Sequence, residues 1–225
     1  MIRRIPGVRG AQAYWYAGSE GNVIIDPGYT GSVRAVLRFL QGDALRPDWV
    51  VLTHHHIDHA GTALAVCQAT GARLAIHRAD APYLVTGRPR ERMTFWGIAD
   101  RLPPRLARFL VSCADCELTL LDDGESIAGL MVVHAAGHTP GSIALWSASE
   151  SALFTGDVLN NVRGIHTPPW TVNHSHAAAG RAPERLLGLR YEHAFFGHGP
   201  AILDGADERV RTFLSASARK PAAVI

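Results

Sequence analysis

The chain has 225 residues, 47% of them apolar and 19% charged, with a formal net charge of +2. This length and composition fit one globular domain, and so weak a charge gives no reason to expect a nucleic-acid-binding face. No apolar run approaches the length of about 18 residues that a membrane span needs. The start is charged without an apolar run behind it, and the chain has three Cys. We therefore expect no export signal, no membrane contact and a reducing, cytoplasmic location.

In the first half of the chain, short apolar runs alternate with helical patterns. The runs predict strands over residues 11–16, 22–25, 49–52 and 73–76. Helical spacing predicts helices over residues 32–40 and 61–71. Residues 78–110 contain four Pro and predict helices and loops that cap one edge of the domain.

The second half repeats this alternation. Strands are predicted over residues 117–121, 131–135, 143–146, 152–154 and 194–196. Helices are predicted over residues 177–189 and 204–214, with a loop over 160–175. The order is typical of a layered α/β domain, in which two sheets pack face to face with helices outside. We expect a single domain over residues 1–225.

Four ligand-type side chains follow the predicted strand 49–52 directly: His54, His56, Asp58 and His59. Imidazole nitrogen and carboxylate oxygen are the groups that zinc and similar metals prefer. His54 and His56 lie two residues apart, so they share a side in an extended segment. Four such groups crowd one ion but can serve two neighbouring ions. A solvated polar turn is the alternative interpretation.

Three more ligand-type residues, His138, Asp157 and His198, lie just after predicted strands and next to Gly. Each alone is typical of a turn residue. Loops at one edge of a layered sheet converge, however, so the strand ends together predict one site.

These motifs together resemble the metallo-β-lactamase superfamily of metal hydrolases. They are His54-x-His56-x-Asp58-His59, Gly-His138-Thr-Pro-Gly, Thr-Gly-Asp157 and Gly-His198-Gly. The resemblance spans most of the chain. It implies an αββα sandwich of two mixed sheets, with the metal site along one sheet edge.

The resemblance also implies a division of the ligands between two divalent ions. His54, His56 and His138 would bind the first, Asp58, His59 and His198 the second, and Asp157 would bridge them. A metal-bound hydroxide would then attack the substrate, and Asp58 would be catalytic as well as a ligand. Zinc is the expected metal, with iron and manganese as alternatives.

The superfamily covers several reactions, and the fold does not choose between them. Secreted β-lactamases of this fold are expected to carry an export signal, and RNA-processing members an extra binding segment. Glyoxalase II enzymes of the longer type extend beyond the last His, and persulfide dioxygenases lack the Gly-His-Gly motif. We expect none of these additions in this chain, which does carry Gly-His-Gly. We therefore expect a glyoxalase-II-like hydrolase of a small thioester, ester or lactone. The alternatives are a phosphodiester or organophosphate hydrolase and a mononuclear-iron sulfur oxygenase.

The loop 160–175 follows Asp157 and predicts a wall for a small-molecule substrate, with His166, Trp170 and His174 as contacts. A polar loop without substrate contact is the alternative. Cys113 and Cys116 form one CxxC pair, which is weak support for zinc or redox work. We expect a monomer or homodimer, with the 78–110 segment as lid or interface.

Overall fold

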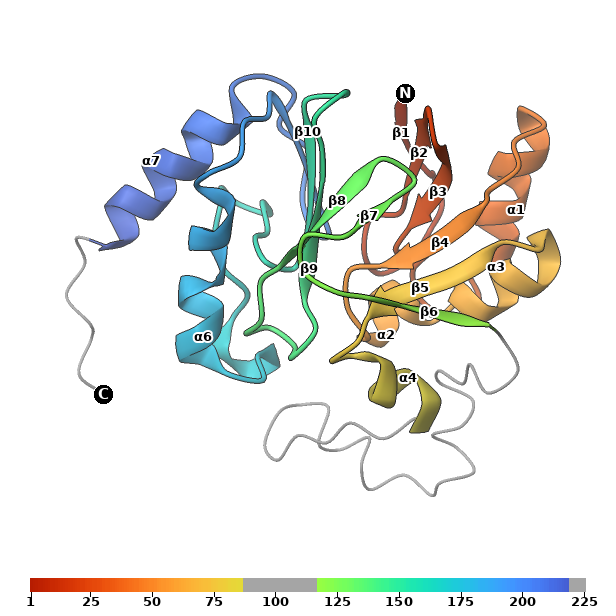
Figure 1. The fold of residues 1–225 in the computed structure, drawn as a ribbon, viewed down its shortest axis with the longest axis horizontal. Coiled ribbons are helices and arrows are strands. Elements are labelled where there is room, and N and C mark those ends of the chain that lie inside the picture. Colours follow the sequence, from red (N-terminus) through yellow and green to blue (C-terminus); the bar gives the residue numbers. More distant parts are fainter. Residues whose placement is uncertain (87–116, 219–225) are drawn as a thin grey trace.

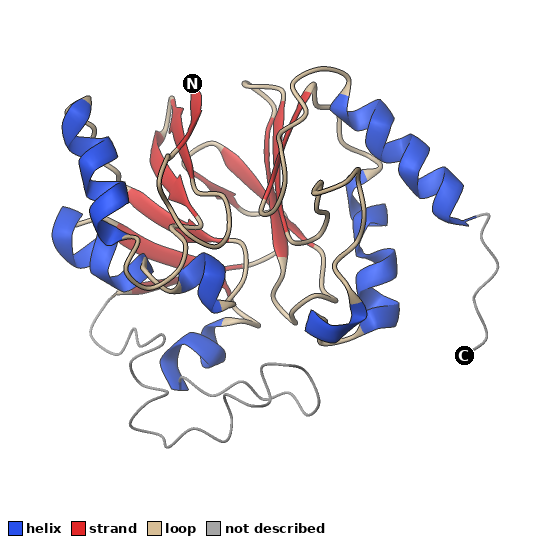
Figure 2. Cartoon of the chain, turned by 180° about the vertical axis from the view of Figure 1, so that it is seen from behind, coloured by secondary structure: helices blue, strands red, loops and turns tan. Residues whose placement is uncertain are grey.

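The computed structural model describes residues 1–86 and 117–218, and it confirms the αββα sandwich. Two mixed β-sheets face each other in the middle, and helices cover the outer face of each sheet (Figure 1). Seen from behind, the strands again form two central layers between the two helical layers (Figure 2). No helix in the described ranges is both long and apolar enough to cross a membrane.

The first sheet has six strands in chain order: β1 (Ile2–Arg4), β2 (Tyr14–Gly18), β3 (Gly21–Ile25), β4 (Trp49–Leu52), β5 (Arg73–His77) and β6 (Leu118–Leu121). The first three are antiparallel, and β3 to β6 run parallel. The helices on this side are α1 (Val33–Gly42), α2 (Ile57–Ala60), α3 (Ala63–Thr70) and α4 (Ala81–Thr86). Val36 of α1 and Val66 of α3 pack against Leu52 and Leu74 on the outer face of the sheet.

The second sheet has the order β11 (His193–Phe196), β10 (Ala152–Gly156), β9 (Ile143–Ser147), β8 (Leu130–His134) and β7 (Ser126–Ile127). Only the β10–β11 pair is parallel. The helical elements on this side are η2 (Trp170–Val172), α6 (His176–Arg181), η3 (Ala182–Leu186) and α7 (Ala206–Ala218). Leu186 of η3 and Val210 of α7 bury the outer face of this sheet with Leu153.

The layer between the two sheets is apolar and aromatic. In β3, Val23 and Ile25 face this middle layer while Ile24 faces the helices, as the alternation of a strand requires. Phe154 of β10 lies against two rings of the first sheet, with centroids 5.6 Å from Tyr14 and 6.2 Å from Tyr16. Because strands are buried on both faces, they appear in the sequence as near-continuous apolar runs.

The prediction for residues 11–16 was partly wrong, because the strand begins only at Tyr14. The Ala11 N–H donates to Asp58 O at 3.0 Å, and the Gln12 N–H donates to Gly197 O at 2.7 Å. These residues bond to two loops of the predicted metal site, the one after β4 and the one after β11, instead of continuing the ladder with β3. The sequence also missed β1 and β7, which have three and two residues and are too short to show a pattern.

One predicted helix is divided in the structure, and another is shorter than predicted and follows a separate turn. The segment 177–189 forms α6 and then the 3₁₀ turn η3, where Pro183 lacks the N–H that an α-helix needs. The segment 61–71 forms only α3, after a separate single turn α2. Gly61 separates these two helices, and a Cβ there would meet Thr30 N at 2.6 Å.

Much of the predicted capping segment lies outside the described residues. Of residues 78–110, the structure describes only those up to 86, which include α4. The arginines between Arg88 and Arg108, and the pair Cys113 and Cys116, lie outside the described ranges. The single-domain organisation and the role of this segment stay predictions.

We expect Phe154→Ala to destabilise the fold by about 3–5 kcal/mol, because it leaves a cavity between the sheets. The free energy of unfolding in urea measures this effect. Leu187→Ala is the control, since Leu187 is an exposed apolar side chain and its truncation should change little. Equal effects of the two substitutions would contradict the central position of Phe154.

Candidate metal centre

All seven predicted ligands come together at one edge of the sandwich, although they are far apart in the chain. Their loops follow the ends of four strands: four residues come after β4, one after β8, one after β10 and one after β11. Their ligand atoms form three groups, each within 4.8 Å: His54, His56 and His138; His54, His59 and Asp157; Asp58, His59 and His198. The sets His54, His56, His138 and Asp58, His59, His198 match the predicted division and are called the first and the second group below. The remaining set joins one residue of each group to Asp157.

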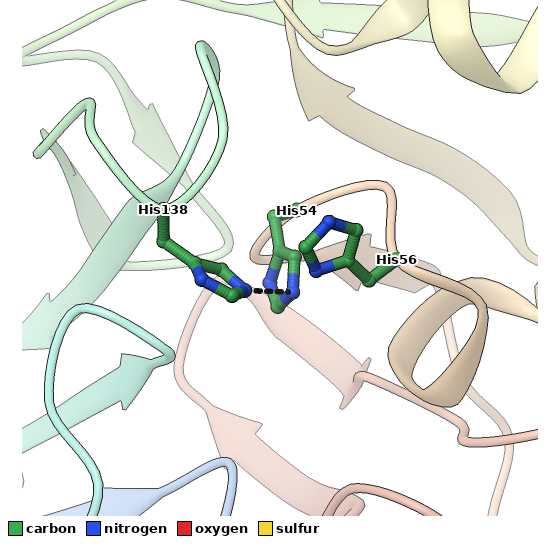
Figure 3. Close-up of side chains that lie close together, drawn as sticks. All are labelled: His54, His56 and His138. Atoms are coloured by element: carbon green, nitrogen blue, oxygen red, sulfur yellow. Dashed lines mark hydrogen bonds between the residues drawn. The ribbon is translucent and has the colours of Figure 1, made fainter. Parts of the chain in front are cut away.

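The first group brings together residues from both sheets. His54 and His56 come from the loop after β4, and His138 reaches them from the β8–β9 loop (Figure 3). His138 Nε2 lies 3.2 Å from His54 Nε2. Two ligands bound to one zinc ion at roughly 2.0–2.1 Å in tetrahedral geometry would be about 3.4 Å apart. The spacing therefore fits a shared ion.

The protonation of these two rings follows from their outer partners. His138 Nδ1 lies 2.9 Å from Asn173 Oδ1, an amide oxygen that only accepts, so Nδ1–H donates. Thr53 Oγ1 donates to Asp26 Oδ2 at 2.6 Å, so it accepts from His54 Nδ1 at 3.1 Å. Both neutral rings therefore carry their proton on Nδ1 and a lone pair on Nε2.

Two nitrogen lone pairs thus face each other across 3.2 Å. A proton between them would make one ring an imidazolium. Burial, and then the neighbouring histidines, hold the pKa of His54 well below its usual range. Burial also lowers the pKa of His138. Neutral imidazoles with converging lone pairs are the form in which histidine binds a metal.

The second group adds negative charge. His198 Nε2 lies 3.2 Å from Asp58 Oδ2, and His59 Nε2 lies 3.8 Å from the same oxygen. Asp157 reaches both groups, because its Oδ2 lies 3.5 Å from His138 Nε2 and also 3.5 Å from His198 Nε2. Its other oxygen lies 3.4 Å from His59 Nε2. Asp157 therefore occupies the position between the two groups.

His59 gives an independent test of whether a cation fits. Its Nδ1 lies 2.8 Å from Asp26 Oδ2, and its Nε2 is buried with no hydrogen-bond partner among the described residues. Burial lowers the pKa of His59, but Asp26, Asp157 and Asp58 outweigh it and raise the pKa well above its usual range. The carboxylates thus favour positive charge at this nitrogen, and a divalent ion would supply it.

The two groups differ in exposure. His54 and His59 are fully buried, whereas the side chain of His198 is 30% exposed and that of Asp58 is 17% exposed. Solvent therefore reaches the cluster beside the second group.

Several supporting residues escaped the sequence analysis. Asp26 directly follows β3, as Asp157 directly follows β10, so its position in the sequence does carry a signal. Asp80 and Asn173 gave no such signal, because they lie inside loops. His55, which lies between two candidate ligands in the chain, places its Nδ1 2.9 Å from Asp80 Oδ2.

The predicted substrate contacts lie on the segment that carries Asn173. Trp170 is 68% exposed in η2, three residues before Asn173. The His174 N–H donates to His138 O at 2.9 Å, and His166 pairs through its backbone with Asn160. Their contact with substrate stays a prediction.

A model of the family described as "Metallo-beta-lactamase superfamily" matches residues 6–198. The chain belongs to that superfamily. The match contains all the motifs from the first histidine to His198, and the chain is a metal-dependent hydrolase of this superfamily.

Known relatives within the superfamily point to more than one substrate. The "Probable metallo-hydrolase YflN" of Bacillus subtilis is 28% identical over 201 residues, 79% of this chain and 75% of that protein. The human "Acyl-coenzyme A thioesterase MBLAC2" is 31% identical over 170 residues, 66% of this chain and 58% of that protein. The crystal structure of the BLEG-1 B3 metallo-beta-lactamase is similar with a TM-score of 0.73 and 25% identity, covering 96% of this chain and 100% of that one.

We expect Gly197→Ala to disrupt the metal centre while the fold persists. A Cβ at this position would meet Asp157 Oδ1 at 2.5 Å and His59 Cε1 at 2.7 Å. Elemental analysis should show less bound metal than in the wild-type protein, with an unchanged far-UV circular dichroism spectrum. Gly188→Ala is the matched control, because its Cβ would meet no heavy atom within 4 Å. Full metal content in Gly197→Ala would contradict this geometry.

Proposed function

We propose that the chain is a dinuclear metal-dependent hydrolase that acts on a small thioester, ester or lactone. His54, His56 and His138 would hold one divalent ion, and Asp58, His59 and His198 the other, with Asp157 between them. The observation that carries this proposal is the position of Asp157, whose Oδ2 is equally distant from a histidine of each group.

The ligand set favours zinc, because imidazole and carboxylate groups suit it, with iron and manganese as alternatives. Two such ions, when bound, supply Lewis acidity and make water reactive near neutral pH. The outer partners Asn173, Thr53 and Asp26 contact the Nδ1 atoms of His138, His54 and His59, which leaves each Nε2 available to bind an ion. Such partners fix ring orientation and raise ligand basicity.

Asp58 has a second role in this proposal. Burial raises its pKa, but His59 and a hydrogen bond from His198 outweigh burial and lower the pKa to about 2. Asp58 is therefore a carboxylate at neutral pH, so it can accept a hydrogen bond from a water molecule and orient it. Its partial exposure places it on the side from which solvent reaches the cluster.

Two observations support the substrate class. The human relative is named an acyl-coenzyme A thioesterase, and the alignment covers 66% of this chain. The exposed Trp170, on the segment that also carries Asn173, offers an apolar surface to an acyl group. A compact thioester or ester agrees with both observations.

A substrate panel tests the proposal. Protein stripped with a chelator and reloaded with zinc should hydrolyse a thioester, an ester or a lactone with a higher kcat/KM than a bis-aryl phosphodiester or nitrocefin. The chelated protein should be inactive. His138→Ala, prepared in parallel, should also be inactive, which excludes a contaminating hydrolase.

Other results of the panel would replace the substrate class. A preference for the phosphodiester would support the phosphodiesterase alternative, and a preference for nitrocefin would support a β-lactamase. One iron per chain with oxygen uptake on a sulfur substrate would support the oxygenase and overturn the proposal.

We expect Asp58→Asn to lower kcat by about 10²–10⁴-fold in protein that retains both ions, because an amide is a poorer acceptor for water. Metal content and kcat measured on the same sample separate this effect from lost binding. Asp122→Asn is the control, since Asp122 is an exposed partner of Arg78. Full activity of Asp58→Asn with both ions bound would leave Asp58 as a ligand only.

A further inference from the structure

A buried carboxylate outside the seven candidate ligands joins two of the metal-binding loops. Asp80 lies between β5 and α4 with an exposed fraction of 0%. Its Oδ2 accepts from His55 N and His55 Nδ1, both at 2.9 Å, and from Thr139 Oγ1 at 2.8 Å. Its Oδ1 accepts from Gly141 N at 2.6 Å. Four donors thus satisfy one buried charge.

These donors come from opposite sheets. His55 belongs to the loop that follows β4 of the first sheet, whereas Thr139 and Gly141 belong to the β8–β9 loop of the second. Gly141 lies close against Asp80, because a Cβ on Gly141 would meet Asp80 N at 2.6 Å and Asp80 Cγ at 2.7 Å. Asp80 is therefore packed directly between the two loops.

Two of the three donor residues are chain neighbours of candidate ligands. His55 lies between His54 and His56, and Thr139 follows His138. The three histidines of the first group therefore belong to two loops that Asp80 ties together. We propose that Asp80 is a positioning residue that sets the distance between these histidines and so the affinity of the first ion site. This inference rests on the proposed dinuclear function.

The second group is held by other contacts. His59 Nδ1 bonds to Asp26. The Ala11 N–H donates to the carbonyl of Asp58, and the Gln12 N–H donates to the carbonyl of Gly197, next to His198. A loss of Asp80 should therefore weaken the first ion site and leave the second site nearly unchanged. A general loss of stability would weaken both.

The test measures zinc affinity at one ion site at a time. His198→Ala keeps the first group intact, and His138→Ala keeps the second. Asp80→Asn preserves shape, but its amide nitrogen cannot accept, so at least one donor from His55, Thr139 or Gly141 loses its acceptor. Competition with a chromophoric chelator should show zinc binding weakened about 10–100-fold in the His198→Ala background. In the His138→Ala background, the zinc affinity of the second ion site should stay nearly the same.

Cobalt gives a second readout. The visible spectrum of Co²⁺ in the first ion site should change with Asp80→Asn, because the ligand geometry changes, and the spectrum of the second site should not. Asp123→Asn is the matched control: Asp123 also accepts a backbone N–H, from His134, but it is exposed on the surface. It should alter neither ion site.

Equal weakening of both ion sites, or of neither, would overturn the positioning role. If Asp80→Asn does not fold, Thr139→Val removes one of the four hydrogen bonds to Asp80, together with the bond between Thr139 Oγ1 and Ser142 Oγ. It should weaken the first ion site by less, and an unchanged site would then overturn the inference. A wild-type chain that binds two zinc ions while Asp80→Asn has no effect would refute this inference alone. A wild-type chain that does not bind two ions would refute the proposed function and this inference together.

Discussion

The candidate metal site depends on one arrangement: two imidazole nitrogens face each other with no proton between them. His54 Nε2 and His138 Nε2 lie 3.2 Å apart, and each ring uses its Nδ1–H elsewhere. Converging lone pairs in a buried space are unfavourable unless a cation lies between them. The outer hydrogen bonds therefore maintain an arrangement that is ready for a metal, and they do so with Asn173 and Thr53, which lie outside the ligand set.

The candidate site is divided between the two sheets, so its geometry depends on how firmly the sheets are joined. The aromatic layer around Phe154 joins their faces, and Tyr14 Oη donates to Phe196 O at 2.8 Å. At the edge, Ile143 N donates to Thr53 O at 2.9 Å, and the Asp80 network crosses the same boundary. Apolar packing thus brings the loops near each other, and a few directional bonds set the final distances.

Much of the fold could be predicted because its strands are buried on both faces. Apolar runs located most of the longer strands, and the position of His and Asp just after them located the candidate ligands. The failures have local causes. Gln12 pairs with a site loop rather than with a strand, and Pro183 changes an α-helix to a 3₁₀ turn. β1 and β7 are too short to produce a period.

The sequence by itself determined the candidate ligand types, their order and the family, because each metal-binding motif is local and keeps its spacing along the chain. Tertiary structure alone decided which side chains support those ligands. Asp26 meets His59 across 33 positions, Asn173 meets His138 across 35, and Asp80 meets Gly141 across 61. No periodicity along the chain encodes such contacts. They arise only when two sheets pack face to face and their loops meet at one edge.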